Sequence, residues 1–170
     1  HVVLTYELYL LLRASNILEV SEHTQMLKDY LSSVVHQSRP FRDHVRVVVS
    51  GAFCEQPPLP LIRALESSGC YIVDDDWVLG ARYQLEEIQI NATSDPLELL
   101  TEAYLKHTVS TASRYEASEQ KGRFLVRQVR HRRAEGVIFA APSFCDPALL
   151  ERPMLQDVLS KEGIPHTGFK

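Results

Sequence analysis

No apolar run in this sequence approaches the roughly 18 residues that a helix needs to cross a bilayer. The chain also opens without the basic, apolar and small-residue regions of a signal peptide. Its net charge of -4 argues against binding of the chain as a whole to a nucleic-acid phosphate backbone. These absences predict a cytoplasmic protein with neither a membrane nor a nucleic acid as partner.

Local motifs for common enzyme chemistries are missing as well. The sequence has no GxGxxG after a strand, no GxxxxGKS or GxxxxGKT phosphate loop, no GxSxG elbow and no HExxH metal motif. The seven histidines are scattered, and none pairs with another at a spacing of four residues. Neither nucleotide binding nor hydrolysis is therefore indicated by a local motif.

Cysteine is scarce, with three residues at Cys54, Cys70 and Cys145. An odd number in a chain without secretory features does not indicate a disulfide framework and fits reduced thiols. Metal binding or redox chemistry by these thiols stays open. The remaining composition, 45% hydrophobic and 24% charged, is typical of a soluble globular protein with a substantial core.

The order of apolar patterns predicts two helices followed by alternating strands and helices. From about Leu4 to Val35, apolar residues recur at helical spacing, with a break at Ser15 and Asn16. The alternation that follows favours a parallel sheet covered by helices. The expected strands are Val45–Ser50, Cys70–Val73, a run from Val137, and Ile164–Phe169, and the expected helices begin at Pro60, at Asp95-Pro96, near Ser118 and after Pro153. The predicted fold class is therefore α/β with about four strands, as a helical segment over residues 1–40 and an α/β domain over residues 41–170.

The last helix is expected to be interrupted by Pro153. Cys145-Asp146-Pro147 provides a start, since aspartate can cap a helix and proline suits its first position. Proline has no backbone N–H and does not fit deep inside a helix that makes its full set of hydrogen bonds. We therefore expect a short turn before Pro153 and the main helix after it.

Cys54 and Cys145 each follow a strand-like run by a few residues. In an open parallel sheet, the loops after the carboxyl ends of the strands share one edge, where ligands and cofactors bind. The two thiols can thus meet in space, whereas Cys70 begins its strand and is expected at the opposite edge as a small core residue. A cofactor site and a pair of ordinary free thiols remain alternatives, because two cysteines alone cannot complete a zinc or iron-sulfur site.

Charged side chains near the same edge are further candidates. Asp74, Asp75 and Asp76 end the second strand in an acidic loop that either binds a cation, orients a substrate or forms a solvated turn. Arg82 and Tyr83 follow on the same side, and either face a cleft or make an ordinary ion pair. We keep Asp75, Asp76, Arg82 and Tyr83 as candidates for a substrate cleft.

Two other groups have simpler explanations. Glu55 and Asp146 are oxygen donors beside the thiols, but such acids are more often solvated or cap a helix. A basic run could meet an anionic ligand such as the phosphates of coenzyme A, but on a helix it more often forms a solvated face. That run comprises Arg123, Arg127, Arg130, His131, Arg132 and Arg133.

Several phrases, taken whole and in order, resemble the family that contains benzoyl-CoA reductase and 2-hydroxyacyl-CoA dehydratase subunits. The phrases are VRVVVSGAFC at 45–54, LESSGCYIVDDD at 65–76, LGARY at 79–83, GVIF at 136–139, FCDP at 144–147 and GIP at 163–165. The resemblance runs from about Val45 to the last residue and corresponds to the carboxyl-terminal half of such subunits. The residues at 74–77 and 144–147 resemble those of benzoyl-CoA reductase subunits of C-type or B-type more than those of the dehydratases.

The resemblance implies a flavodoxin-like α/β domain, one of two that hold a four-iron four-sulfur cluster between them. It implies that Cys54 and Cys145 are cluster ligands. A further cysteine ligand would come from an amino-terminal domain outside this sequence, so the chain is expected to be a fragment of a longer subunit. The fragment alone is expected to be inactive.

The same resemblance implies a reaction and its partners. The expected activity is two-electron dearomatisation of an aromatic acyl-CoA such as benzoyl-CoA, in the anaerobic degradation of aromatic compounds. Electrons would pass from ferredoxin through a partner module that hydrolyses ATP, so no ATP motif is expected here. The alternatives are a 2-hydroxyacyl-CoA dehydratase subunit, which keeps the cluster but eliminates water, and a non-catalytic α/β interaction domain whose thiols are incidental.

Overall fold

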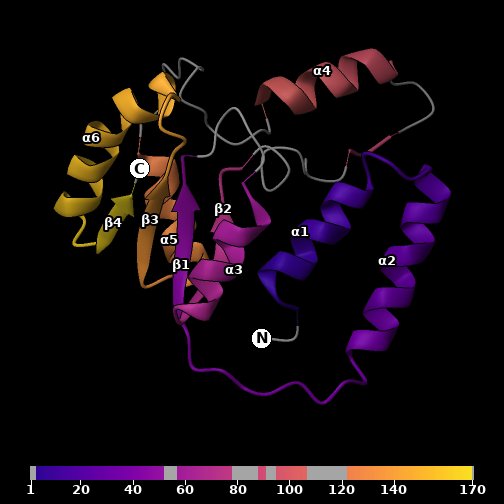
Figure 1. Ribbon diagram of the computed structural model, residues 1–170. Coiled ribbons are helices and arrows are strands. Elements are labelled where there is room, and N and C mark those ends of the chain that lie inside the picture. Colours follow the sequence, from indigo (N-terminus) through magenta and orange to yellow (C-terminus); the bar gives the residue numbers. More distant parts are fainter. Residues whose placement is uncertain (1–2, 52–56, 78–87, 91–94, 107–121, 170) are drawn as a thin grey trace. The chain divides into compact units, whose positions relative to one another are not determined.

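The computed structural model describes residues 3–51, 57–77, 88–90, 95–106 and 122–169. Within these ranges the elements follow the order α1–α2–β1–α3–β2–α4–α5–β3–α6–β4 (Figure 1). After α2, one or two helices separate successive strands in the described ranges, which confirms the prediction of an α/β fold. The chain divides into two compact units, residues 1–45 with 57–72 and residues 46–56 with 73–170. The predicted boundary after residue 40 stays a prediction.

The first unit contains three helices. α1 covers Thr5–Ala14, α2 covers Val20–Val34 and α3 covers Leu59–Ser67. The first two helices and the break between them agree with the prediction for residues 4–35. Pro60 lies in the first turn of α3, where its missing N–H breaks no helical hydrogen bond.

Thr5 joins the start of α1 to α3 and to β2 (Cys70–Asp75). Its backbone N–H donates to the buried Glu66 carboxylate at 2.7 Å, and its hydroxyl donates to the Ile72 carbonyl at 3.3 Å. The first N–H groups of a helix lack acceptors within the helix, and the positive end of the helix dipole favours a carboxylate. The buried Glu66 side chain therefore has a hydrogen-bond donor, and α1 is capped from another element.

Glu7, in the first turn of α1, is the centre of a polar network. Its carboxylate accepts hydrogen bonds from the Tyr30 hydroxyl at 2.9 Å and the Leu4 N–H at 3.3 Å, and it pairs with Arg39 at 2.6 Å. Burial alone would raise the pKa of Glu7. The hydrogen bonds from Arg39, Tyr30 and Leu4, with the charge of Arg39, outweigh burial and lower the pKa below its usual value.

We expect Glu7→Gln to lower the stability of the full-length protein by about 0.5–1 kcal/mol at pH 7, the usual value of a partly exposed ion pair. Because the folded-state pKa is lowered, this stabilisation is complete above the unfolded-state pKa of about 4.3 and disappears as the pH falls through the folded-state value. Urea denaturation at pH 7 and in acid should show the difference between wild type and variant shrinking. Glu22→Gln, on the exposed surface of α2, is the control; an equal loss at both pH values would contradict the network.

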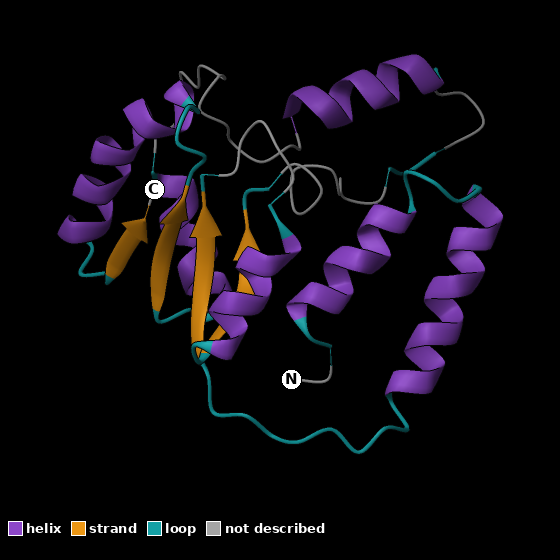
Figure 2. Cartoon of the chain, viewed as in Figure 1, coloured by secondary structure: helices purple, strands orange, loops and turns teal. Residues whose placement is uncertain are grey.

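The four strands form one sheet in the order β2-β1-β3-β4. β1 covers Val45–Ser50, β3 covers Gly136–Ala140 and β4 covers His166–Phe169. β1 pairs with β3 in parallel, and β3 pairs with β4 in parallel. Figure 2 shows the four arrows pointing the same way. The predicted parallel sheet of about four strands is thus confirmed.

β2 runs beside β1 in the same direction, as two backbone hydrogen bonds show. The Val45 N–H, at the start of β1, donates to the Gly69 carbonyl just before β2 at 2.9 Å. The Asp76 N–H, just after β2, donates to the Val49 carbonyl near the end of β1 at 3.2 Å. Both strands therefore begin together and end together, and the residues that follow them share one edge.

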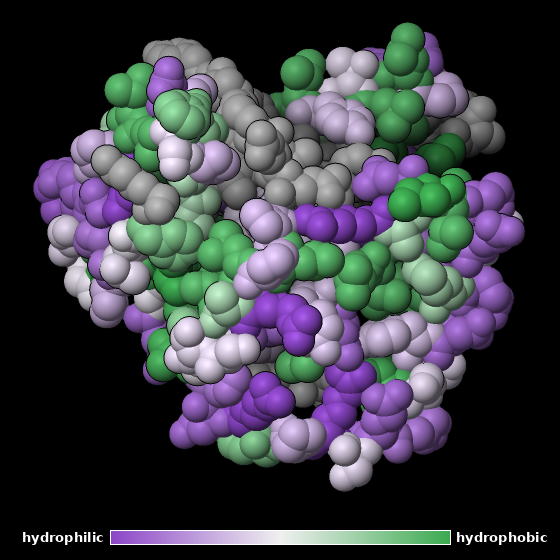
Figure 3. Space-filling view, in the orientation of Figure 1, coloured by the Kyte–Doolittle hydropathy of each residue, from purple (hydrophilic) through white to green (hydrophobic). Residues whose placement is uncertain are grey.

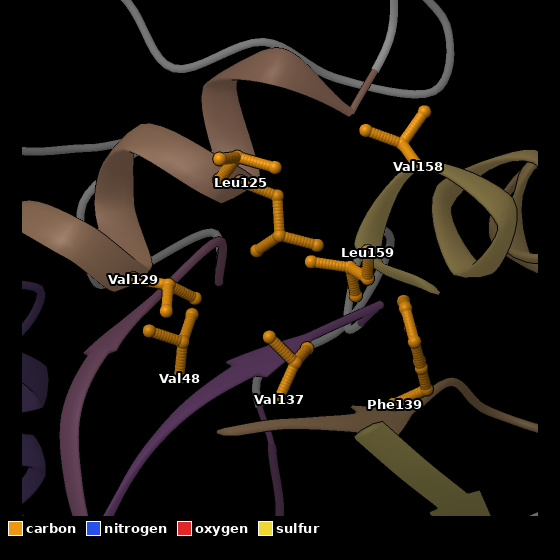
Figure 4. Close-up of a cluster of buried hydrophobic side chains, with 8 residues drawn as sticks. Val48, Leu125, Val129, Val137, Phe139, Val158 and Leu159 are labelled. Atoms are coloured by element: carbon orange, nitrogen blue, oxygen red, sulfur yellow. The ribbon is translucent and has the colours of Figure 1, made fainter. Parts of the chain in front are cut away.

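The core of the second unit lies between the sheet and two helices, α5 (Arg123–Arg132) and α6 (Asp146–Lys161). Val48 and Val137 are paired across β1 and β3, so they face the same side of the sheet. Figure 4 shows side chains of α5 and α6 pointing towards them. Both helices thus cover one face. The buried cluster comprises Val48, Leu125, Val126, Val129, Val137, Phe139, Val158 and Leu159.

α6 continues through Pro153, so the expected turn before Pro153 is wrong. A proline inside a helix destabilises it by about 3 kcal/mol, because one backbone hydrogen bond is lost and the ring clashes with the carbonyl four residues earlier. Buried residues hold both halves of α6 on the core, with Ala148 before the proline and Val158 and Leu159 after it. Burying Val158 and Leu159 contributes about 1.5–3 kcal/mol each, which together outweighs the cost of the proline.

α4 covers Pro96–Lys106 and begins where the dipeptide Asp95-Pro96 predicted a start. The Asp95 carboxylate accepts a hydrogen bond from the Leu97 N–H at 2.8 Å. An acceptor at this position satisfies one of the first N–H groups of a helix. The local capping signal was therefore sufficient to place the start of α4.

Hydrophobic side chains on the surface lie among polar ones. On the face drawn in Figure 3, green hydrophobic patches alternate with purple hydrophilic ones. Ile17, Phe41 and Phe144 are 86%, 86% and 97% exposed. Among the helices that the structure describes, none combines the length and the apolar character needed to span a membrane.

Candidate functional site

The carboxyl ends of β1 and β3 lie side by side. Ser50, the last residue of β1, is opposite Phe139 of β3. A Cβ atom added to Gly51 would lie 3.2 Å from the backbone nitrogen of Ala141, the first residue after β3. The segments that follow these two strands therefore leave the sheet from adjacent points, as parallel topology predicts.

Cys145 is buried near this edge, at the start of α6. It is 3% exposed and packs with Ala141, Ala148 and Leu149. Its N–H donates to the Pro142 carbonyl at 3.0 Å, which turns the chain into the helix. Cys145 holds the N-cap position of α6.

Asp146 does not cap α6, in contrast to the sequence-based expectation. The hydrogen bond from the Cys145 N–H to the Pro142 carbonyl closes a turn that ends at Cys145. Asp146 is therefore the first residue of the helix rather than the residue before it. An acid in the first turn still interacts favourably with the helix dipole. The cap position is thereby left to the cysteine.

Cys54 lies outside the described residues, as do Glu55, Arg82 and Tyr83. Their suggested roles stay predictions. Cys70 is the first residue of β2 and is partly buried. It therefore lies at the opposite end of the strands from Ser50, as predicted, and its carbonyl oxygen is 3.2 Å from His44 Nδ1.

Asp74 and Asp75 belong to β2 rather than to an acidic loop, because β2 pairs with β1 as far as the Asp76 N–H. Asp74 pairs with Arg132 at 2.7 Å, and Asp75, which is 8% exposed, accepts a hydrogen bond from the Trp77 N–H at 2.8 Å. Neither contact was foreseen, because both depend on how the strand ends. The expected solvated acidic loop is wrong for these two residues.

The Asp76 carboxylate reaches the end of β1. It accepts hydrogen bonds from the Ser50 hydroxyl at 2.8 Å and from the Gly51 N–H at 2.9 Å. Sequence reasoning did not select Ser50. The only signal was that a serine and a glycine end a run of buried valines.

The basic run lies at the exposed surface of α5. Arg123 and Arg130 both pair with Glu162, at 2.7 and 2.5 Å, and Arg132 pairs with Asp74. Basic side chains near the end of a helix also complement its dipole. These contacts favour the solvated face over a coenzyme A site.

A cavity of about 150 Å³ lies within the first unit, lined by Glu7, Arg39, His44, Glu66 and Tyr71 among others. Glu7 pairs with Arg39, and Glu66 accepts from the Thr5 N–H. Arg42 also lines the cavity. None of the site residues predicted from the sequence lines it.

A family model described as 2-hydroxyglutaryl-CoA dehydratase, D-component, matches residues 2–170. The chain belongs to this family. Among curated proteins, it is 52% identical to the C subunit of benzoyl-CoA reductase from Thauera aromatica over 165 residues, which are 96% of this chain and 42% of that protein. These findings confirm the family predicted from the ordered phrases.

Two relatives within the dehydratase group are more distant. The chain is 26% identical to the (R)-phenyllactyl-CoA dehydratase beta subunit of Clostridium sporogenes, over 91% of this chain and 40% of that protein. It is 26% identical to the beta subunit of (R)-2-hydroxyglutaryl-CoA dehydratase from Acidaminococcus fermentans, over 91% of this chain and 41% of that protein. The chain spans about two fifths of the length of these curated relatives.

Among the described residues, Cys145 suits one ligand position of an iron-sulfur cluster. No group of three or more His, Cys, Asp or Glu residues in the described ranges is arranged to hold a metal ion. Cys145 nevertheless offers one buried sulfur in an apolar setting at a helix N-terminus, which suits a cluster thiolate. A four-iron cluster takes four ligands, so Cys54 and ligands outside this chain would have to complete the site.

Proposed function

We propose that this chain is part of the iron-sulfur subunit of an ATP-dependent, ferredoxin-linked benzoyl-CoA reductase of the cytoplasm. The observation that carries the proposal is the 52% identity to the C subunit of a benzoyl-CoA reductase over 96% of the chain. This is twice the 26% identity to the two dehydratase subunits. The position of Cys145 beside the ends of β1 and β3 supports it.

In the proposed reaction, an aromatic acyl-CoA gains two electrons and two protons, and one double bond of its ring is reduced to leave a cyclic diene. A four-iron four-sulfur cluster, when bound, supplies single electrons at low potential. Ferredoxin is the proposed electron source, and a partner module that hydrolyses ATP is the proposed carrier. The other reductase subunits complete the enzyme.

The chain's own contribution is to hold iron and to keep the site dry. Cys145, and Cys54 from the segment after β1, are the proposed ligands, shared with an amino-terminal part of the full-length protein. Ala141, Ala148 and Leu149 surround the Cys145 side chain and exclude water from the sulfur. Exclusion of water also protects reactive ring intermediates. Asp75, Asp76, Arg82 and Tyr83 remain proposed residues of the substrate cleft.

The assay that tests this function compares two substrates. The full-length protein, purified without oxygen and combined with its partner subunits and reduced ferredoxin, should consume benzoyl-CoA only when ATP is present. A 2-hydroxyacyl-CoA should remain unchanged under the same conditions. Dehydration of the hydroxyacyl-CoA would overturn the reductase in favour of the dehydratase. Neither reaction, together with no iron or acid-labile sulfide, would favour the non-catalytic interaction domain.

A further inference from the structure

The cavity in the first unit is lined by a buried carboxylate that has no cation beside it. Glu66 is 5% exposed, and its Oε1 atom accepts from the Thr5 N–H at 2.7 Å. In the described ranges, no second hydrogen bond and no ion pair reaches Glu66. Burying a carboxylate is costly unless hydrogen bonds and an opposite charge compensate it. The Oε2 atom of Glu66 is therefore an open acceptor at the cavity.

Glu7 lines the same cavity, but its charge is already matched. Arg39 Nη1 pairs with Glu7 Oε2 at 2.6 Å, while Arg39 Nε and Nη2 donate to the Gln37 side chain at 3.1 and 2.9 Å. All three nitrogens of the Arg39 guanidinium are thus engaged away from Glu66. The Oε1 atom of Glu7 has no partner among the described residues and is a second open acceptor.

Arg42 is the complementary case, a cation without an anion. It lines the cavity and is exposed, so it lies where the cavity opens to solvent. No hydrogen bond or ion pair joins its guanidinium to any part of the chain that the structure describes. A guanidinium is well suited to a carboxylate, which it binds through two parallel hydrogen bonds. The cavity therefore combines a carboxylate that lacks a cation with an arginine that lacks an anion.

The size of the cavity limits what it holds. Its volume is about 150 Å³, and cavities of this volume in other proteins hold a molecule the size of benzene. Leu4, Pro40 and Tyr71 give it apolar surface for a short carbon body. An acyl-CoA is far larger than this space. The ligand of this cavity is thus a different molecule from the proposed substrate of the enzyme.

We propose that this cavity binds a small zwitterion of the class of short α-amino acids. The ammonium group donates to the open oxygens of Glu66 and Glu7, and the carboxylate pairs with Arg42 at the opening. A zwitterion fits because the two unmatched charges of the cavity are opposite in sign. The site is separate from the proposed function, since no proposed cluster ligand or cleft residue lines it.

The test is equilibrium dialysis of the full-length protein against radiolabelled alanine, which has as many non-hydrogen atoms as benzene. Two competitors each lack one charge, propionate the ammonium group and ethylamine the carboxylate. Alanine should bind saturably, with one molecule per polypeptide. Each competitor should bind at least about tenfold more weakly, as expected for the loss of hydrogen bonds to a charged group.

Two variants test the assigned contacts. Arg42→Gln and Glu66→Gln should each lower the affinity for alanine at least about tenfold, since each removes one of the two charges. Lys28→Gln is the control, because it removes an exposed positive charge on α2 away from the cavity. It should bind alanine as the wild type does.

Absence of saturable alanine binding to the wild type would overturn the site. Propionate or ethylamine binding as tightly as alanine would overturn the zwitterion in favour of a simple anion or cation. If circular dichroism shows that Glu66→Gln does not fold, Arg42→Gln decides, because this exposed side chain has no contact to lose: unchanged affinity overturns the proposal. Iron content and benzoyl-CoA reduction are independent of these results, so the two proposals fail separately.

Discussion

Replacing Cys145 by alanine is expected to remove most of the iron from the full-length protein. Under the proposed function, the variant loses one of four cluster ligands at a place where water cannot easily substitute, because the side chain is 3% exposed. Iron and acid-labile sulfide per polypeptide should fall by at least about tenfold, the lower range for changes around a metal site. Anaerobic purification followed by metal analysis measures both quantities.

The other two cysteines of this chain provide the controls for the Cys145→Ala variant. Cys54→Ala should lose iron to the same extent as Cys145→Ala, since the proposal makes both ligands of one cluster. Cys70→Ala should keep its iron, because Cys70 begins β2 at the opposite end of the strands. Full iron content in the Cys145→Ala protein would contradict the cluster proposal. Equal loss in all three variants would indicate general destabilisation instead.

Leu159→Ala is expected to lower the free energy of unfolding by about 3–5 kcal/mol. Leu159 is 0% exposed and lies in the cluster that joins α6 to the sheet and α5 (Figure 4). Interiors are packed as densely as organic crystals, so a helix held at both ends cannot move in to fill the cavity. Such a loss is a large part of the roughly 5–15 kcal/mol that stabilises a typical domain.

Leu150→Ala, on the same helix, is the matched control. Leu150 is 80% exposed, so its truncation removes few contacts. We expect a change of less than about 0.5 kcal/mol. Urea denaturation of the full-length variants, followed by circular dichroism, measures both differences. Similar effects of the two substitutions would contradict the position of Leu159 in the core.

Local sequence patterns predicted most elements, because each pattern reports a property of neighbouring residues. The valine run at Val45–Ser50 is typical of a buried strand, and Asp95-Pro96 marks a helix start by capping alone. The turn predicted before Pro153 was wrong for the same reason, since that prediction used a local rule that excludes proline from a helix interior. The structure overrides that rule because Val158 and Leu159 bury enough apolar surface to hold α6 together.

For the candidate site, too, some features followed from the sequence and others only from the tertiary structure. By itself, the sequence determined the α/β class, the family and the placement of a cysteine after each of two strands, since these follow from periodicity and ordered phrases. Only the tertiary structure decided that Gly51 lies against Ala141 and that Asp76 bonds to Ser50 and Gly51. These contacts join residues far apart in the chain, and strand order and register, which no local pattern specifies, bring them together.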